Sequence, residues 1–255
     1  MKIQYLSDLH MELMSPNKFN KLCDKIVPKC DVLVLAGDIG NPLHQDEKYK
    51  IFLHSTSEKF KKIFLVSGNH EYYGNDINKT NEEIESICGS ISNVSFLNNS
   101  TELYNVYRFI GTTQWTHITD SRYLINDFYA IKEMNVNRYN NLHEVARLFL
   151  KKSIEKSCED NEKVVVITHH LPFHKLTHQK YLTNFANYNH CFSAELHDVI
   201  CHPNTIQSWF YGHTHTASAQ KILDIQYYCN PLGYDGEDNK PDFNRVVDVK
   251  LALPT

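Results

Sequence analysis

The sequence lacks the features of a membrane or secreted protein. No run approaches the ~18 consecutive apolar residues that span a bilayer, and the opening residues, MKIQYLSDLH, contain no apolar signal-peptide segment. The seven cysteines are scattered and include no CxxC pair, so we expect neither a disulfide framework nor a thiolate zinc site. These absences predict a cytoplasmic protein with free thiols that does not bind membranes.

The sequence also lacks an excess of positive charge and any linker. Lys and Arg number 26 against 30 Asp and Glu, a net charge of −4. The protein as a whole therefore does not attract nucleic-acid backbones, although a local basic groove stays open. No Pro-, Gly- or Ser-rich tract and no repeat divides the 255 residues. We predict one domain over residues 1–255, with a polar and aromatic excursion at about 114–141 that covers the substrate.

Short apolar runs bounded by turn residues predict buried β-strands. These runs are Ile3–Leu6, Val32–Ala36, Ile63–Val66, Val106–Ile110, Val164–Thr168, Ile206–Tyr211, Ile225–Cys229 and Val246–Val249. Stretches with helical periodicity are Asn17–Val27, Asp46–Phe60, Asp76–Cys88, Leu142–Cys158 and Ala194–Cys201. Strands and helices alternate early in the chain and strands predominate later, which indicates an α/β fold.

Histidine is abundant, with 15 residues, and several histidines follow apolar runs together with Asp or Asn. The polar residues at five such run ends are Asp8 and His10, Asp38, Asn69 and His70, His169 and His170, and His213 and His215. In an extended segment residues i and i+2 project to the same side, so Asp8 and His10 can converge. Because open α/β sheets place their sites at the carboxyl ends of strands, these side chains predict one common site.

Oxygen and imidazole ligands without thiolate suit a divalent first-row metal, here Mn before Fe, Zn or Ni. An aspartate shared between two ions holds them roughly 3.5–4 Å apart. Such a pair clamps a phosphoryl group and lowers the pKa of a bound water. We therefore expect two divalent metal ions as cofactors, with acid–base chemistry beside them.

The same residues resemble a known family. The blocks Asp8-x-His10, Gly37-Asp38, Gly68-Asn69-His70-Glu71, His169 and Gly212-His213-Thr214-His215 look like the five-block pattern of the calcineurin-like metallophosphoesterases. The segments YLSDLHMEL, GNHEYYG, THHLPF and CNPLGY resemble a branch of small stand-alone, mostly bacterial-type phosphoesterases. The resemblance implies a four-layer α/β/β/α sandwich, in which two mixed β-sheets are flanked by helices.

The resemblance also implies roles for these residues. It assigns one metal to Asp8, His10 and His215, the other to Asn69, His169 and His213, and the bridging position to Asp38. A hydroxide bridging the metals would attack phosphorus in line, and His70, the general acid, would contact a phosphate oxygen and protonate the leaving group. Glu71 would either orient a neighbouring histidine or act as an acid at a helix N-terminus.

Departures from the family pattern narrow the class of substrate that we expect. Residues 39–43, IGNPL, lack the arginine that serine/threonine protein phosphatases of this family carry after the second block. That absence disfavours a protein phosphatase and a dianionic monoester. We predict a phosphodiesterase acting on a small phosphate ester. The alternatives are a phosphomonoesterase on a nucleotide or sugar phosphate, a nuclease, and a catalytically silent protein-binding scaffold.

Candidate substrate contacts lie in the excursion and after the fourth block. Arg138 and His170 are the candidate substrate-binding residues, with simple packing as the alternative for His170. Further candidates are the cations Arg122, Lys175 and Lys180 and the aromatic residues Trp115, Tyr123, Phe128, Tyr129, Tyr139, Phe173 and Tyr181. Lys far outnumbers Arg, as in AT-rich genomes, so the cytoplasm would be that of a bacterium or, for a viral protein, of its host. The sequence predicts no oligomeric state.

Overall fold

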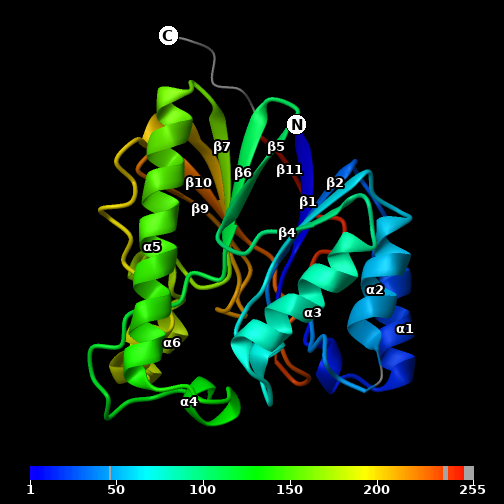
Figure 1. Cartoon of the computed structure of the whole chain (residues 1–255), viewed down its shortest axis with the longest axis horizontal. Helices are drawn as coiled ribbons and strands as arrows, with labels where there is room; N and C mark the ends of the chain where they lie inside the picture. The colour runs from blue at the N-terminus through cyan, green and yellow to red at the C-terminus, as the bar shows by residue number, and fades with distance from the viewer. Residues whose placement is uncertain (46, 238–240, 250–255) are drawn as a thin grey trace.

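The computed structural model describes residues 1–45, 47–237 and 241–249. Two β-sheets lie face to face, with helices on their outer sides (Figure 1). Both sheets are mixed. This confirms the predicted fold class, a four-layer α/β/β/α sandwich.

The first sheet has the order β11-β1-β2-β3-β4, and β11 is its antiparallel member. Its strands are β1 (Lys2–Leu6), β2 (Val32–Ala36), β3 (Lys62–Val66), β4 (Val94–Phe96) and β11 (Val246–Asp248). Strands β2 and β3 are buried along their whole length, because parallel strands covered on both faces need apolar side chains on both.

The second sheet has the order β5-β6-β7-β8-β10-β9, with parallel pairing in the middle and antiparallel pairing at both ends. Its strands are β5 (Ser100–Tyr104), β6 (Tyr107–Thr112), β7 (Lys163–Thr168), β8 (Ile206–Phe210), β9 (Ser218–Ile222) and β10 (Ile225–Cys229). The edge strands β5 and β9 alternate half-buried and exposed residues, which is typical of strands covered on one face.

Helices cover the outer faces of both sheets (Figure 1). On the first sheet lie α1 (Pro16–Lys25), α2 (Lys48–Ser57) and α3 (Ile77–Gly89), and on the second lies α5 (Val136–Glu159). The short helices are α4 (Asp127–Ala130), α6 (Gln179–Asn184) and the 3-10 turns η1 (Met11–Leu13), η2 (His70–Tyr72), η3 (His174–Leu176), η4 (Ala186–Cys191) and η5 (Pro203–Thr205). Within the described ranges, no helix has the length and apolarity needed to cross a bilayer.

The alternation of side chains along the strands fills the space between the layers. Val34 of β2 lies in the core between the sheets, while its neighbour Leu35 lies in the core beneath the helices of the first sheet. Phe64 of β3 and Phe109 of β6 stack across the sheet interface, with ring centroids 3.8 Å apart. This packing fixes the two sheets against each other.

One predicted helix, Ala194–Cys201, is wrong. The segment forms an irregular turn in which Leu196 and Val199 are fully buried. Two of its backbone N–H groups bond to the segment after β7: Ala194 N–H donates to Leu171 O at 2.8 Å and Leu196 N–H donates to Pro172 O at 2.9 Å, while Val199 N–H donates to Leu196 O at 3.1 Å in a single turn. The apolar spacing therefore reflects burial beneath a loop and not a helix.

Candidate metal centre

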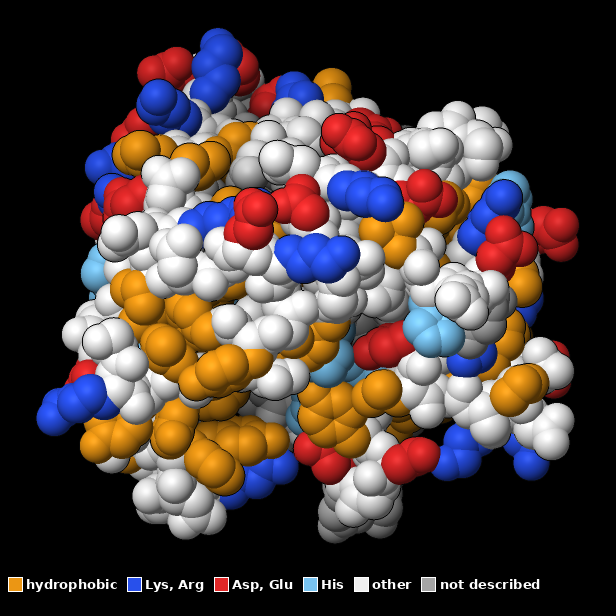
Figure 2. Space-filling model, turned by 60° about the horizontal axis from the view of Figure 1, so that its bottom comes forward, with side chains coloured by type: hydrophobic (Ala, Val, Ile, Leu, Met, Phe, Trp, Pro, Cys, Tyr) orange, Lys and Arg blue, Asp and Glu red, His pale blue; other side chains and the backbone are white. Residues whose placement is uncertain are grey.

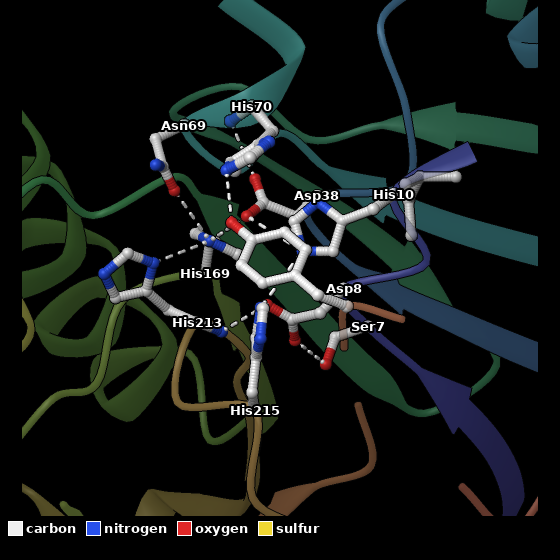
Figure 3. A network of polar contacts seen from close by, with 12 residues as sticks. Ser7, Asp8, His10, Asp38, Asn69, His70, His169, His213 and His215 are labelled. Carbon is white, nitrogen blue, oxygen red and sulfur yellow. Dashed lines mark hydrogen bonds and ion pairs between the residues drawn. The ribbon is translucent and has the colours of Figure 1, made fainter. Parts of the chain in front are cut away.

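The residues predicted to form one site lie together at one edge of the sandwich, after β1, β2 and β3 of the first sheet and β7 and β8 of the second (Figure 3). The structure brings together Asp8, His10, Asp38, Asn69, His70, His169, His213 and His215. Parallel strands from both sheets end at this edge, so residues far apart in sequence meet there.

The first cluster consists of Asp8, His10 and His215, whose ligand atoms lie within 4.8 Å of one another. The Nε2 atoms of His10 and His215 are 3.0 Å apart, and His215 Nε2 is 3.5 Å from Asp8 Oδ1. His215 Nδ1 donates to Glu237 Oε2 at 2.8 Å. The Nδ1 proton is therefore engaged outside the cluster, and the Nε2 lone pair faces into it.

The second cluster consists of Asp38, His169 and His213, again within 4.8 Å of one another. His169 Nδ1 donates to Ala36 O at 3.0 Å, which directs Nε2 toward Asp38 Oδ2 at 3.2 Å and Asn69 Oδ1 at 3.1 Å. Nδ2 of Asn69 donates to Asp127 Oδ1 at 2.8 Å. That bond fixes the amide so that its oxygen faces the cluster.

Asp38 lies between the two clusters. Besides its contact with His169, its Oδ2 is 3.9 Å from His10 Nε2, and it forms a third group of candidate ligands with His10 and His70. Its Oδ1 accepts the backbone N–H of His70 at 2.8 Å. One carboxylate oxygen is therefore held by the backbone while the other faces both clusters.

The electrostatics of the centre fit divalent cations. Asp8 and Asp38 are 0% and 1% exposed, and the ionisable side chains that pair with their carboxylates among the described residues are imidazoles. Burial opposes ionisation of Asp38, but the imidazoles of His169 and His70 outweigh it and hold its pKa well below the ordinary range. Burial and the nearby His170 hold the pKa of His213 well below its usual value, so this imidazole is neutral. Its Nε2 has no hydrogen-bond partner among the described residues. Buried carboxylates, an amide oxygen and a neutral imidazole form the donor set of a divalent metal site.

The backbone at the centre is unusual. Asp8, His10, Asp38, His213 and His215 all have positive φ, between 43° and 67°. Non-glycine residues adopt this left-handed conformation infrequently. Gly37 (φ 84°) precedes Asp38, and a Cβ there would lie 2.5 Å from His169 Nδ1. The loops therefore turn sharply and approach closely, and this brings the side chains of both clusters together.

Glu71 lies in the first turn of the 3-10 helix η2, which matches the second of its two predicted roles. It is fully buried and accepts the backbone N–H groups of Asp38, Ile39 and Gly68 at 3.1, 2.7 and 2.7 Å. Burial, with the nearby Asp38 charge, raises its pKa to about 8. Glu71 thus fastens the loop after β2 to the loop after β3, and it orients no histidine.

His70 lies between two residues that the sequence reasoning missed. Its Nδ1 is 3.1 Å from Glu12 Oε1, and its Nε2 is 2.8 Å from the hydroxyl of Tyr234. Tyr234 could have been considered as a site residue from the sequence, because it lies in the segment CNPLGY, one of those that resemble the small stand-alone phosphoesterases. Glu12 lies two residues after His10, the same spacing from which Asp8 and His10 were predicted to converge. Asp127, the partner of Asn69, begins the short helix α4, in a part of the sequence without helical periodicity that gave no signal.

A cavity of about 220 Å³ opens beside the centre and is lined by Asp38, Asn69, His70, His213 and His215 together with an apolar wall. Figure 2 shows this face: histidines lie near its middle, with hydrophobic side chains gathered beside them. Ile125 and Asn126 of the predicted excursion line the cavity. The excursion thus reaches the site.

Most predicted substrate contacts lie elsewhere. His170 is fully buried, with Nδ1 3.3 Å from Thr113 O and its ring against His213, which fits its packing alternative. Arg138 pairs with Asp76 at 3.1 Å and does not line the cavity, because its guanidinium is bound at the start of α3. The other candidate cations, Arg122, Lys175 and Lys180, do not line it either. Of the candidate aromatic residues Tyr181 does, whereas Trp115, Tyr139 and Phe173 are buried in the cores.

Comparisons with known proteins agree with this geometry. An uncharacterised protein of Acanthamoeba polyphaga mimivirus is 29% identical over 281 residues, covering 98% of each chain. The structure of a phosphopantetheinyl hydrolase from Mycobacterium tuberculosis superposes with a TM-score of 0.70 at 17% identity, covering 91% of this chain and 89% of that one. A dimetal phosphatase from Danio rerio gives 0.53 at 12% identity, with 91% and 87% covered. At these identities the two structures show the shared fold.

The family comparison covers the whole candidate centre. The pattern of the calcineurin-like phosphoesterases matches residues 1–217, a span that runs from β1 to just beyond His215. The fold, the order of the polar blocks and this match agree. This chain belongs to the calcineurin-like phosphoesterase family.

Proposed function

We propose that the chain is a two-metal phosphodiesterase. The observation that carries the proposal is the pair of ligand clusters that meet at Asp38. In this proposal Asp8, His10 and His215 hold one divalent cation, Asn69, His169 and His213 hold the other, and Asp38 serves both. Manganese suits this mixture of oxygen and imidazole donors. Two such cations would polarise phosphoryl oxygens and lower the pKa of a coordinated water.

His70 is the proposed proton donor to the leaving group. It lines the cavity, Glu12 engages its Nδ1, and its Nε2 contacts the hydroxyl of Tyr234, which lines the cavity as well. In this proposal the leaving-group oxygen takes the place of that hydroxyl beside Nε2. The Asp38 and Glu12 carboxylates outweigh burial and raise the pKa of His70, which favours the protonated imidazole. A proton on Nε2 passes to the alkoxide oxygen as its bond to phosphorus breaks, and the imidazole is left neutral.

The charge of the cavity favours a diester over a monoester. Among the described residues that line it there is no Lys or Arg, while Asp38 and Glu237 supply carboxylates. A diester carries a single negative charge and a monoester carries nearly two at neutral pH. If the two metals are the source of positive charge in the cavity, they have less negative charge to neutralise on a diester than on a monoester. Nucleotide monoesters and long nucleic acids, which need additional cations, fit this cavity less well.

The test compares hydrolysis of bis(p-nitrophenyl) phosphate and p-nitrophenyl phosphate by the full chain with added Mn²⁺. We expect the diester to be cleaved faster, and Asp38→Asn to lower kcat by about 10²-fold or more, since it removes charge from both clusters. Asp31→Asn changes an exposed carboxylate paired with Lys61 and serves as the matched control.

The outcomes separate the alternatives. Faster monoester cleavage would replace the diesterase with a monoesterase, and salt-sensitive binding of DNA or RNA would favour a nuclease. Two bound metals without hydrolysis of either ester would contradict the proposal and leave the silent scaffold.

A further inference from the structure

The cavity beside the candidate metal centre has an apolar wall opposite its polar edge. We define the apolar wall as Ile125, Leu171, Tyr181 and Phe192. Leu171 follows the two histidines after β7, Ile125 comes from the excursion before α4, Tyr181 lies in α6, and Phe192 follows η4. Four separate segments therefore contribute apolar side chains to one face of the cavity.

The wall begins at the metal centre and leads outward. The ring centroids of Phe192 and His213 are 5.3 Å apart. Those of Tyr181 and Phe192 are 6.3 Å apart, with an angle of 28° between the ring planes. Phe185 lies a further 6.2 Å from Tyr181 and is 47% exposed. A group attached to a phosphate at the centre would extend along these rings toward the surface.

The wall offers no charge to a second anionic group. Lys180 lies over the ring of Tyr181 at 4.6 Å and is not among the residues that line the cavity. Arg122 pairs with Asp120, and Glu237 adds a carboxylate at the polar edge. A second phosphate or a carboxylate on the substrate would therefore meet apolar rings, with no Lys or Arg among the described residues that line the cavity.

The position of His70 indicates which ester group faces the wall. His70 packs against Tyr73 and Tyr234, whereas the wall starts beside His213. His70, as the proposed proton donor, lies beside the leaving group. The group that stays on phosphorus is therefore the one directed toward Phe192 and Tyr181.

We infer that the apolar wall selects phosphodiesters whose retained ester group is uncharged and aromatic or otherwise apolar. This inference rests on the proposed function and specifies its substrate class. Aromatic rings that pack on Phe192 and Tyr181 gain both area burial and ring–ring contact, which a methyl group does not.

The experiment uses three diesters that all release p-nitrophenol: phenyl, methyl and 4-carboxyphenyl p-nitrophenyl phosphate. We compare kcat/KM for the Mn²⁺-loaded full chain, each value divided by the rate of the same ester in solution. We expect the phenyl ester to exceed the methyl and the carboxyphenyl esters by about tenfold or more.

Variants of the wall test its part directly. Phe192→Ala and Tyr181→Ala should each lower the phenyl-to-methyl ratio of kcat/KM about fivefold, through a higher KM for the phenyl ester. Phe192→Leu keeps an apolar side chain and should retain most of the preference. Ile125→Lys adds a cation to the wall and should improve the carboxyphenyl ester relative to the phenyl ester about fivefold. Tyr129→Ala, at a side chain that is 81% exposed and outside the cavity, is the control.

The outcomes distinguish the two proposals. Hydrolysis of all three esters without a phenyl preference, or a preference that the wall variants leave intact, overturns the inference and leaves the phosphodiesterase standing. No hydrolysis of any ester by the metal-loaded chain overturns both.

Discussion

Glu12 is the residue on which the orientation of His70 depends. Its carboxylate lies 3.1 Å from His70 Nδ1 and 3.5 Å from His10 Nδ1. It is a positioning residue, since it acts through the imidazole of His70. Its effect should therefore depend on how much protonation the leaving group needs.

We predict that Glu12→Gln slows diesters with alkyl leaving groups by about 10²-fold and p-nitrophenyl diesters by less than about threefold. p-Nitrophenolate leaves with little protonation, whereas an alkoxide needs the proton from His70. Steady-state kcat on matched alkyl and aryl diesters measures the difference, with Glu133→Gln, at a residue whose side chain is 86% exposed, as control. An equal loss on both leaving groups would refute a role through His70.

Glu71 makes a separate prediction about stability. Its carboxylate accepts three backbone N–H groups in a fully buried place. Glu71→Gln brings an amide NH₂ against these donors, and we expect the free energy of unfolding to fall by about 2–4 kcal/mol. Urea unfolding of the metal-free chain measures it, with Glu85→Gln on the exposed side of α3 as the comparison. Equal stability of the two variants would contradict this account.

At the residue scale, the sequence was sufficient to bring the polar side chains of the centre to one place. Asp8, His10, Asp38, Asn69, His70, His169, His213 and His215 follow apolar runs, and parallel strand ends meet at one edge. The sequence alone could not predict that Asp127 contacts Asn69, or which residues line the cavity. Those contacts depend on how irregular segments fold over the site, and such segments have no period to interpret. Arg138 shows the same limit, because a charged residue near a site in sequence can be bound elsewhere.

The sharp turns that follow the strands shape the centre. Substitutions at two glycines, Gly68 and the control position Gly89, test how closely these turns must approach. A Cβ at Gly68 would lie 2.1 Å from Asp38 Oδ1 and 2.7 Å from the Asp38 backbone N. We predict that Gly68→Ala displaces the Asp38 side chain and lowers kcat by about 10²-fold, because small misplacements at a reacting centre are costly.

Gly89→Ala is the matched control for Gly68→Ala. Gly89 ends α3, and no atom lies within 4 Å of a Cβ added there. We expect full activity and stability that is unchanged or raised by about 0.5–1 kcal/mol. Activity assays and thermal unfolding compare the two, and a fully active Gly68→Ala would contradict the close approach.

The strands and helices predicted from the sequence differ in how closely they match those of the structure. Val32–Ala36 and Ile225–Cys229 coincide with β2 and β10, because continuous apolar runs mark strands inside a sheet. Strands β4, β5 and β9 were missed, since short or half-exposed strands lack such runs. Helix α5 begins at Val136, earlier than the predicted Leu142, because Asn135 accepts the N–H of Arg138 and caps it there.

At the scale of the whole molecule, the candidate centre joins the two sheets. Its candidate ligands come from the ends of β1, β2 and β3 in one sheet and of β7 and β8 in the other. Metal bound to the folded chain therefore stabilises the packing of the sheets as well as the site.

We predict that EDTA lowers the Tm of the Mn²⁺-loaded chain by about 10–20 °C. Each of the two proposed sites, saturated at a hundred times its Kd, contributes about 2.7 kcal/mol, together about 5.4 kcal/mol, and one kcal/mol corresponds to about 2–4 °C in a chain of this size. Circular dichroism with and without chelator measures the shift, and Asp38→Asn should show a much smaller one. A Tm that is insensitive to chelator and to added Mn²⁺ would argue against metal at this centre.

The five left-handed residues of the centre set stability against activity. Asp8, His10, Asp38, His213 and His215 adopt a backbone conformation that glycine accepts at little cost, so glycine would relieve about 1 kcal/mol of backbone strain at each position while removing a candidate ligand. At Asp8 and Asp38 glycine would also leave the backbone N–H groups of His213 and His70 without their carboxylate acceptors. Selection for folding alone would therefore erode the centre first. A descendant of this chain that no longer needed its chemistry would be expected to lose His10, His213 and His215 before Asp8 and Asp38, whose carboxylates also accept backbone N–H groups.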